Sequence, residues 1–165
     1  MSLDYQDKEI DTEHANNRAR FFDLIAHIED LLEDARIYGK SASSKLFITI
    51  DRFIESESEI EKLAKISGES MPPKNYFDEM SKIATQYLPV VVHRESQKIK
   101  DAIHNLGCLN DGCKRLIDDL SKSVLYYGEM YPNLNLSKYI DEIDSICQKV
   151  PRVTRKNFWQ RFFGN

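Results

Sequence analysis

Residues 44–67 read SKLFITIDRFIESESEIEKLAKIS. Apolar side chains in this stretch recur mostly three or four positions apart, which places them on one face of an α-helix. They are Leu46, Ile50, Phe53, Ile60, Leu63 and Ala64. Gly68 follows directly, and glycine commonly takes the left-handed conformation that ends a helix. The stretch therefore predicts an amphipathic helix that buries one face against other helices.

The same spacing recurs upstream and downstream of this stretch. Upstream it predicts a helix over about residues 12–38, which Gly39 ends as the C′ glycine. Downstream, Asn75 is a typical N-cap for a third helix. That helix reaches Gly107, and Pro89 is expected to kink or restart it because proline lacks the backbone donor.

Two further helices follow, and the links between all the helices are short. One is predicted between Gly112 and Pro132, and the next is capped by Ser137 and stopped by Pro151. No strand-like alternation persists, and the chain has only six Gly and five Pro. Short links between long helices favour antiparallel neighbours. We therefore predict an all-α fold, an antiparallel bundle of four to five helices with a short C-terminal amphipathic helix.

The predicted domain organisation is a helical bundle over residues 1–150 and a cationic aromatic tail over residues 151–165. The 165-residue chain has a net charge of −4, which disfavours a nucleic-acid partner because such binding needs a basic face. Its three cysteines, an odd number, indicate free thiols and a cytoplasmic location. No run reaches the roughly 18 apolar residues that a membrane-spanning helix needs.

The tail carries the clearest candidate site. Residues 152–163, RVTRKNFWQRFF, hold the only Trp, three of the eight Phe, four cations and no acid. Because the whole chain is at −4, the residues outside this segment sum to −8. On a helix its four aromatic residues would span about 140° of the circumference. The candidate partner- or membrane-binding residues are Arg152, Arg155, Lys156, Phe158, Trp159, Arg161, Phe162 and Phe163.

Three interpretations of this segment stay open. Aromatic residues with cations suit a short helix at an anionic membrane surface. The same composition suits a helix that fits the groove of a partner protein. Alternatively, the aromatic residues fold back and close the end of the bundle, with the cations facing its acidic helices.

A catalytic alternative rests on Arg20 and His27. Their spacing resembles the Arg-x4–6-His pair of all-helical ribonucleases of the HEPN class, which implies phosphate binding by Arg and proton transfer by His. Phe21 stands where that class usually has a polar residue, and the pair lies in the first helix rather than late in the chain. A surface Arg and a partly buried His would give the same pattern, so no catalytic residue is assigned.

His104, Cys108, Cys113 and Cys147 come nearest to a metal-binding set. Zinc sites commonly use paired short spacings, whereas these four residues are irregularly spaced. Free cysteines also behave as small buried apolar residues. We therefore expect no metal and no other cofactor.

Residues 83–89, IATQYLP, and 135–143, NLSKYIDEI, resemble segments of the bacterial XpaC-like helical family. That family is labelled for 5-bromo-4-chloroindolyl phosphate hydrolysis. Thr85 and Gln86 replace the paired aromatic residues expected before its Tyr-Leu-Pro. The resemblance implies a bacterial helical protein and no particular catalytic residues.

The sequence favours a non-enzymatic bacterial adaptor or regulatory protein over an enzyme. Its partner is expected to be another protein or an anionic membrane surface, reached through the C-terminal segment. The expected location is the cytoplasm, including the inner face of the membrane if the partner is lipid. The alternative function is a phosphoester or RNA hydrolase of a helical-bundle class that uses Arg20 and His27.

Overall fold

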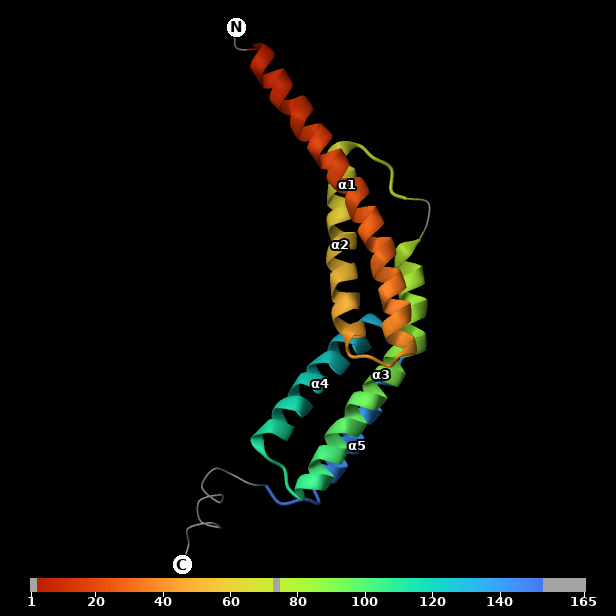
Figure 1. Ribbon diagram of the computed structural model, residues 1–165, viewed down its shortest axis with the longest axis vertical. Helices are drawn as coiled ribbons and strands as arrows, with labels where there is room; N and C mark the ends of the chain where they lie inside the picture. The colour runs from red at the N-terminus through yellow and green to blue at the C-terminus, as the bar shows by residue number, and fades with distance from the viewer. Residues whose placement is uncertain (1–2, 73–74, 153–165) are drawn as a thin grey trace, which may run out of the picture. The chain divides into compact units, whose positions relative to one another are not determined.

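The computed structural model describes residues 3–72 and 75–152, with side chains described from residue 11 onward (Figure 1). Within these ranges the chain forms five α-helices and no strand. They are α1 (Leu3–Lys40), α2 (Lys45–Ser67), α3 (Tyr76–Leu106), α4 (Asp111–Met130) and α5 (Ser137–Cys147). The predicted all-α class is confirmed. The predicted C-terminal helix lies outside the described residues.

The chain divides into two compact units, Met1–Ala84 and Thr85–Asn165. The division falls inside α3, one turn before Pro89. Proline has no N–H, so the Thr85 carbonyl has no donor four residues on, and exposed Thr85 can bond water instead. The helix runs unbroken through Pro89, so of the two expected outcomes, a kink or a restart, the restart is excluded.

In the first unit, a short link joins α1 to α2, and the two helices pack against each other (Figure 1). The link begins with two bonds typical of a Schellman motif: Ser43 N–H donates to the Tyr38 carbonyl (2.9 Å) and Ala42 N–H to the Gly39 carbonyl (3.0 Å). Ala42 takes the left-handed conformation, with φ of 50°. Gly39 is buried in the last turn of α1, so its predicted role as the C′ residue was wrong.

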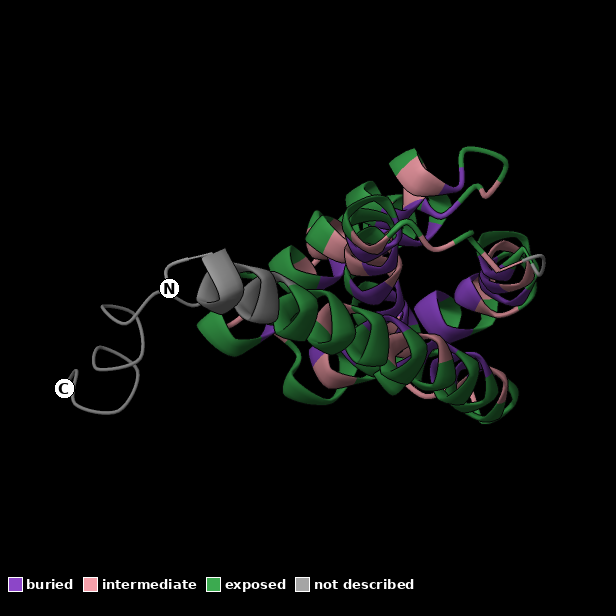
Figure 2. Cartoon of the chain, turned by 90° about the horizontal axis from the view of Figure 1, so that it is seen from above, coloured by how far each residue is buried: buried purple, intermediate pink, exposed green. Residues whose placement is uncertain are grey.

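The core of the first unit comes from one face of each helix, with exposed residues on the opposite faces (Figure 2). Its fully buried side chains include Phe21, Ile28, Leu32, Leu46, Ile50, Phe53, Ile60 and Met80. Helix α1 starts nine residues before the predicted Thr12, and residues 11–16 are all exposed. Arg18 Nε pairs with Glu69 Oε1 at 2.8 Å, just beyond the end of α2. The early turns of α1 therefore extend past the helix that covers the rest of it.

The ends of α2 and α3 match the sequence predictions. Gly68 ends α2 with φ of 67°. The Asn75 side chain accepts a hydrogen bond from the Asp78 N–H at 3.1 Å. Both features satisfy backbone groups that have no partner inside the helix.

The second unit contains the rest of α3 with α4 and α5. Asn110 caps α4 by accepting from the Cys113 N–H at 2.8 Å. Lys100 on α3 donates to Glu142 on α5 at 2.6 Å. Helix α5 begins at Ser137, with Leu136 at the N-cap position and no capping bond from a side chain, so the predicted Ser137 cap was wrong by one residue. Among the described residues, no helix has an apolar stretch able to cross a bilayer.

Candidate functional site

The C-terminal segment starts from a defined place on the second unit. Leu109, in the link between α3 and α4, donates its N–H to the Pro151 carbonyl at 3.0 Å. Leu109 and Arg152 form an isolated parallel bridge, and Arg152 is exposed. The other predicted binding residues of the segment lie outside the described residues: Arg155, Lys156, Phe158, Trp159, Arg161, Phe162 and Phe163.

Charge is distributed unevenly between the two units. Residues 1–84 hold 18 acidic and 11 basic side chains, a net charge of −7. Residues 85–152 hold nine of each, and residues 153–165 hold three basic side chains and no acid. The excess negative charge of the chain therefore belongs to the first unit, and its unbalanced positive charge belongs to the C-terminal segment.

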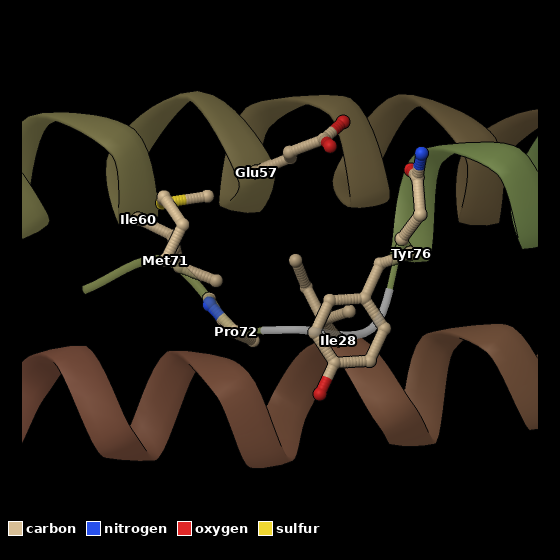
Figure 3. A pocket seen from close by; sticks show the side chains of 7 residues that line it. Ile28, Glu57, Ile60, Met71, Pro72 and Tyr76 are labelled. Atoms are coloured by element: carbon tan, nitrogen blue, oxygen red, sulfur yellow. The ribbon is translucent and has the colours of Figure 1, made fainter.

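A cavity of about 290 Å³ opens in the first unit where the chain passes from α2 to α3 (Figure 3). Side chains from α1, α2, the link and the start of α3 surround it. They are Ile28, Glu57, Ile60, Met71, Pro72, Asn75 and Tyr76. We call this the seam pocket.

Glu57 occupies a position of the buried seam of α2. The buried apolar residues of that seam alternate spacings of four and three, at Leu46, Ile50, Phe53, Ile60 and Ala64. Glu57 lies four residues after Phe53 and three before Ile60, so it completes the same heptad stripe. The carboxylate therefore stands where the pattern otherwise places an apolar side chain.

The half-buried Glu57 carboxylate has no hydrogen-bond or ion-pair partner among the described residues. Loss of water around it, and then repulsion from Glu61 one turn on, raise the pKa of Glu57 above its ordinary value of 4.5. The ionised carboxylate is therefore less favourable here than in bulk water, and a nearby cation would offset that cost.

Tyr76 closes another side of the seam pocket. Its ring lines the cavity, and its hydroxyl points toward α1, where it donates to Glu29 Oε1 at 3.2 Å (Figure 3). Burial, and then this bond to Glu29, raise the pKa of the Tyr76 phenol. The phenol is therefore a fixed, neutral donor, and the cavity presents its aromatic ring.

A second cavity of about 290 Å³ lies at the other end of the first unit, near the link between α1 and α2. Its charged lining is mixed: Asp34 faces it with Lys45 and Arg52. Lys45 Nζ also lies 5.5 Å from the centre of the Tyr38 ring, in a cation–π contact. This cavity offers no net attraction to a cation, unlike the seam pocket.

Arg20 and His27, the residues of the alternative function, both lie on α1. Arg20 forms an ion pair with Glu59 of α2, and His27 is exposed on α1. Seven residues of helix separate their backbones by about 10 Å. A phosphate held by the guanidinium would first have to displace Glu59.

The cysteines do not form a metal centre with their neighbours. Among the described residues, no three His, Cys, Asp or Glu side chains gather to hold a metal ion. Cys113 is buried, and Cys108 and Cys147 are partly buried. Burial, and then Asp144 and Cys113, raise the pKa of the Cys147 thiol, which keeps it protonated.

No protein-family model, no curated protein and no solved structure matches the chain. The resemblance to the XpaC-like family stays a prediction.

The sequence analysis did not find the seam pocket, because it did not distinguish Glu57 from the other acids of this helix, Glu55, Glu59 and Glu61. Residues two apart on a helix are separated by about 200°, so these four acids cannot share one face. Glu55 and Glu61 are exposed, Glu57 lines the pocket, and Glu59 pairs with Arg20. The single acid in the apolar heptad was the signal that could have found the site.

Proposed function

We propose that this chain is a non-enzymatic helical adaptor whose cationic aromatic segment, residues 152–163, docks on an acidic, apolar groove of a protein. The separation of charge along the chain carries the proposal. A segment with four cations, four aromatic residues and no acid follows residues 85–151, whose net charge is −1, and a first unit whose net charge is −7. Large aromatic anchors with arginines are typical of the residues that dominate protein–protein binding.

A protein partner suits the chain better than an anionic membrane does. Each cation near an anionic lipid surface contributes about 1 kcal/mol, but the acidic first unit is repelled by the same surface. A groove on a protein can place its acids locally, opposite the segment, and does not have to attract the whole chain. Exposed Arg152, held beside Leu109, gives the segment a fixed starting point for such docking.

Trp159 tests this proposal, because it is the only tryptophan and lies within the segment. The dilute full-length chain is titrated with phosphatidylserine and phosphatidylcholine vesicles at low and high salt, and emission and acrylamide quenching are recorded. We expect an exposed, quenchable Trp159 that neither vesicle changes. A blue, protected emission at every dilution would show that the segment packs on its own chain and would overturn the proposal. A blue shift with phosphatidylserine alone, reversed by salt, would indicate a membrane partner instead.

A further inference from the structure

The seam pocket contains one partly buried carboxylate that no described residue pairs with. The Glu57 carboxylate sits between Phe53 and Ile60 on the buried stripe of α2, without a cation or donor among the described residues. Two arginines of the same unit pair with other acids: Arg20 with Glu59, and Arg36 with Glu33 and Glu79. A cation brought from outside would offset the cost of the desolvated carboxylate.

The size and walls of the pocket limit what else it can take. At about 290 Å³ it lies at the small end of the range for ligand sites, which suits one large side chain better than a nucleotide or another large cofactor. Ile28, Ile60 and the Tyr76 ring provide apolar walls. Met71, nearly half exposed, provides a flexible rim that adapts to an aromatic ring. The matching ligand is therefore an aromatic group with a cation close to it.

The chain itself contains a segment of this chemistry. In residues 152–163 each aromatic residue lies within four positions of an arginine or lysine, as Trp159 does of Arg155 and Arg161. The unit that carries the pocket has a net charge of −7, whereas residues 85–152 are balanced. At short range, where salt does not screen it, the acidic first unit therefore attracts the segment more than residues 85–152 do.

We propose that the seam pocket of one chain binds the cationic aromatic segment of a second copy. An aromatic side chain enters between Ile28, Ile60 and Tyr76, and a neighbouring cation pairs with Glu57. The inference rests on the proposed function above and names the partner as the same protein. Two copies that exchange their segments reciprocally form a closed dimer, whereas one-way docking extends into a chain of molecules.

The test uses the full-length chain with Phe158, Trp159, Phe162 and Phe163 all changed to Ala. This acceptor contains no tryptophan, so a synthetic peptide of residues 152–165 supplies the only Trp emission. We expect a saturable blue shift of the peptide when it is titrated with the acceptor, and weaker binding as salt rises. The same peptide in which Arg155, Lys156 and Arg161 are changed to Glu should not bind.

Two variants of the acceptor distinguish binding at the pocket carboxylate from attraction by the net charge of the unit. Glu57→Lys should weaken binding about tenfold, because it replaces an attraction at a half-buried site with a repulsion. Glu55→Lys makes the same change of net charge on an exposed position of the same helix, and should weaken binding less than about threefold. Glu57→Gln preserves shape if Glu57→Lys disturbs folding, and should weaken binding about threefold.

Failure of this inference can be told from failure of the proposed function. An exposed Trp159 in the dilute native chain, with no binding of the peptide to the acceptor, would overturn the second-copy partner alone. Equal weakening by Glu57→Lys and Glu55→Lys would also overturn it, because attraction would then be spread over the unit. A Trp159 that is protected at every dilution in the native chain would overturn both proposals.

Discussion

The two units of this chain use the same helical pattern but distribute polar groups differently. Buried hydroxyls are satisfied within their own helix in both units, as where Thr49 donates to the Lys45 carbonyl at 3.0 Å and Ser96 donates to the His93 carbonyl at 2.7 Å. In the first unit Glu57 occupies a core-seam position without such a partner, in a unit with a net charge of −7. Folding stability explains the first arrangement and not the second, because an apolar residue at position 57 would cost less. This difference is the observation behind our proposal that Glu57 pairs with a cation of a ligand.

The largest expected effect comes from removing core volume from the first unit alone. Phe53 is fully buried, so Phe53→Ala should lower the free energy of unfolding by about 3–5 kcal/mol. Amide hydrogen exchange should show lost protection in α1 and α2, with α4 and α5 keeping most of theirs. Equal loss in all of these helices would contradict a division into two compact units. Leu125→Ala, at an exposed position of α4, is the control with little expected effect.

Helix caps test whether the two units differ at their helix ends. Asn75 and Asn110 make the same capping bond in the first and second units, so Asn75→Ala and Asn110→Ala should each cost about 1 kcal/mol. Ser44 stands at the N-cap of α2 without such a bond, so Ser44→Ala should cost much less. Urea unfolding measures all three variants. If the two Asn variants lowered the free energy of unfolding by very different amounts, the two units would also differ in how much their helix caps contribute to stability.

The Glu57 carboxylate should lower the free energy of unfolding of the isolated chain, relative to an apolar side chain at the same position. Glu57→Leu completes the apolar stripe between Phe53 and Ile60, and should raise the free energy of unfolding by about 1 kcal/mol. Glu55→Leu, on an exposed face of the same helix, should change it by less than about 0.5 kcal/mol. A loss of stability in Glu57→Leu would show that the carboxylate supports the fold, and would remove the argument that it awaits a ligand.

The smallest expected effect is a dependence on pH. The pKa of Glu57 is raised above 4.5 in the folded chain, so the folded state binds more protons than the unfolded state just above that pH. The contribution of Glu57 to stability is therefore greatest below about pH 4.5 and falls as the pH rises through the raised pKa. Urea unfolding of the native chain and of Glu57→Gln should show a difference that changes over this range. An unchanged difference from about pH 4 to pH 7 would contradict the raised pKa.

The sequence predicted the helices well because their apolar spacing and several end signals are local. Gly68 and Asn75 act where the pattern placed them, whereas Gly39 and Ser137 do not. The left-handed residue after α1 is Ala42, and Gly39 lies buried inside the last turn of the helix. A glycine near the end of a helical pattern therefore does not by itself mark the residue that ends the helix.

The candidate site was less predictable, since it depends on how α1, α2 and α3 meet. The composition of residues 152–163 predicts a binding segment, but no local signal indicates what that segment would bind. The heptad position of Glu57 was visible in the sequence, whereas the cavity beside it requires the return of the chain at Tyr76. The spacing of Arg20 and His27 suggested a catalytic pair in the sequence, whereas in the structure Arg20 forms an ion pair with Glu59.

The central claim, that the cationic aromatic segment binds the acidic first unit at the seam pocket, is tested most directly by nuclear magnetic resonance. Isotope-labelled acceptor chain, with the four aromatic residues of its own segment changed to Ala, is titrated with the unlabelled peptide of residues 152–165. We predict that the largest shifts fall on Ile28, Glu57, Ile60, Met71 and Tyr76, and that the mixed-charge cavity around Tyr38 and Arg52 is unaffected. Shifts spread evenly over the first unit, or concentrated in α4 and α5, would contradict the claim.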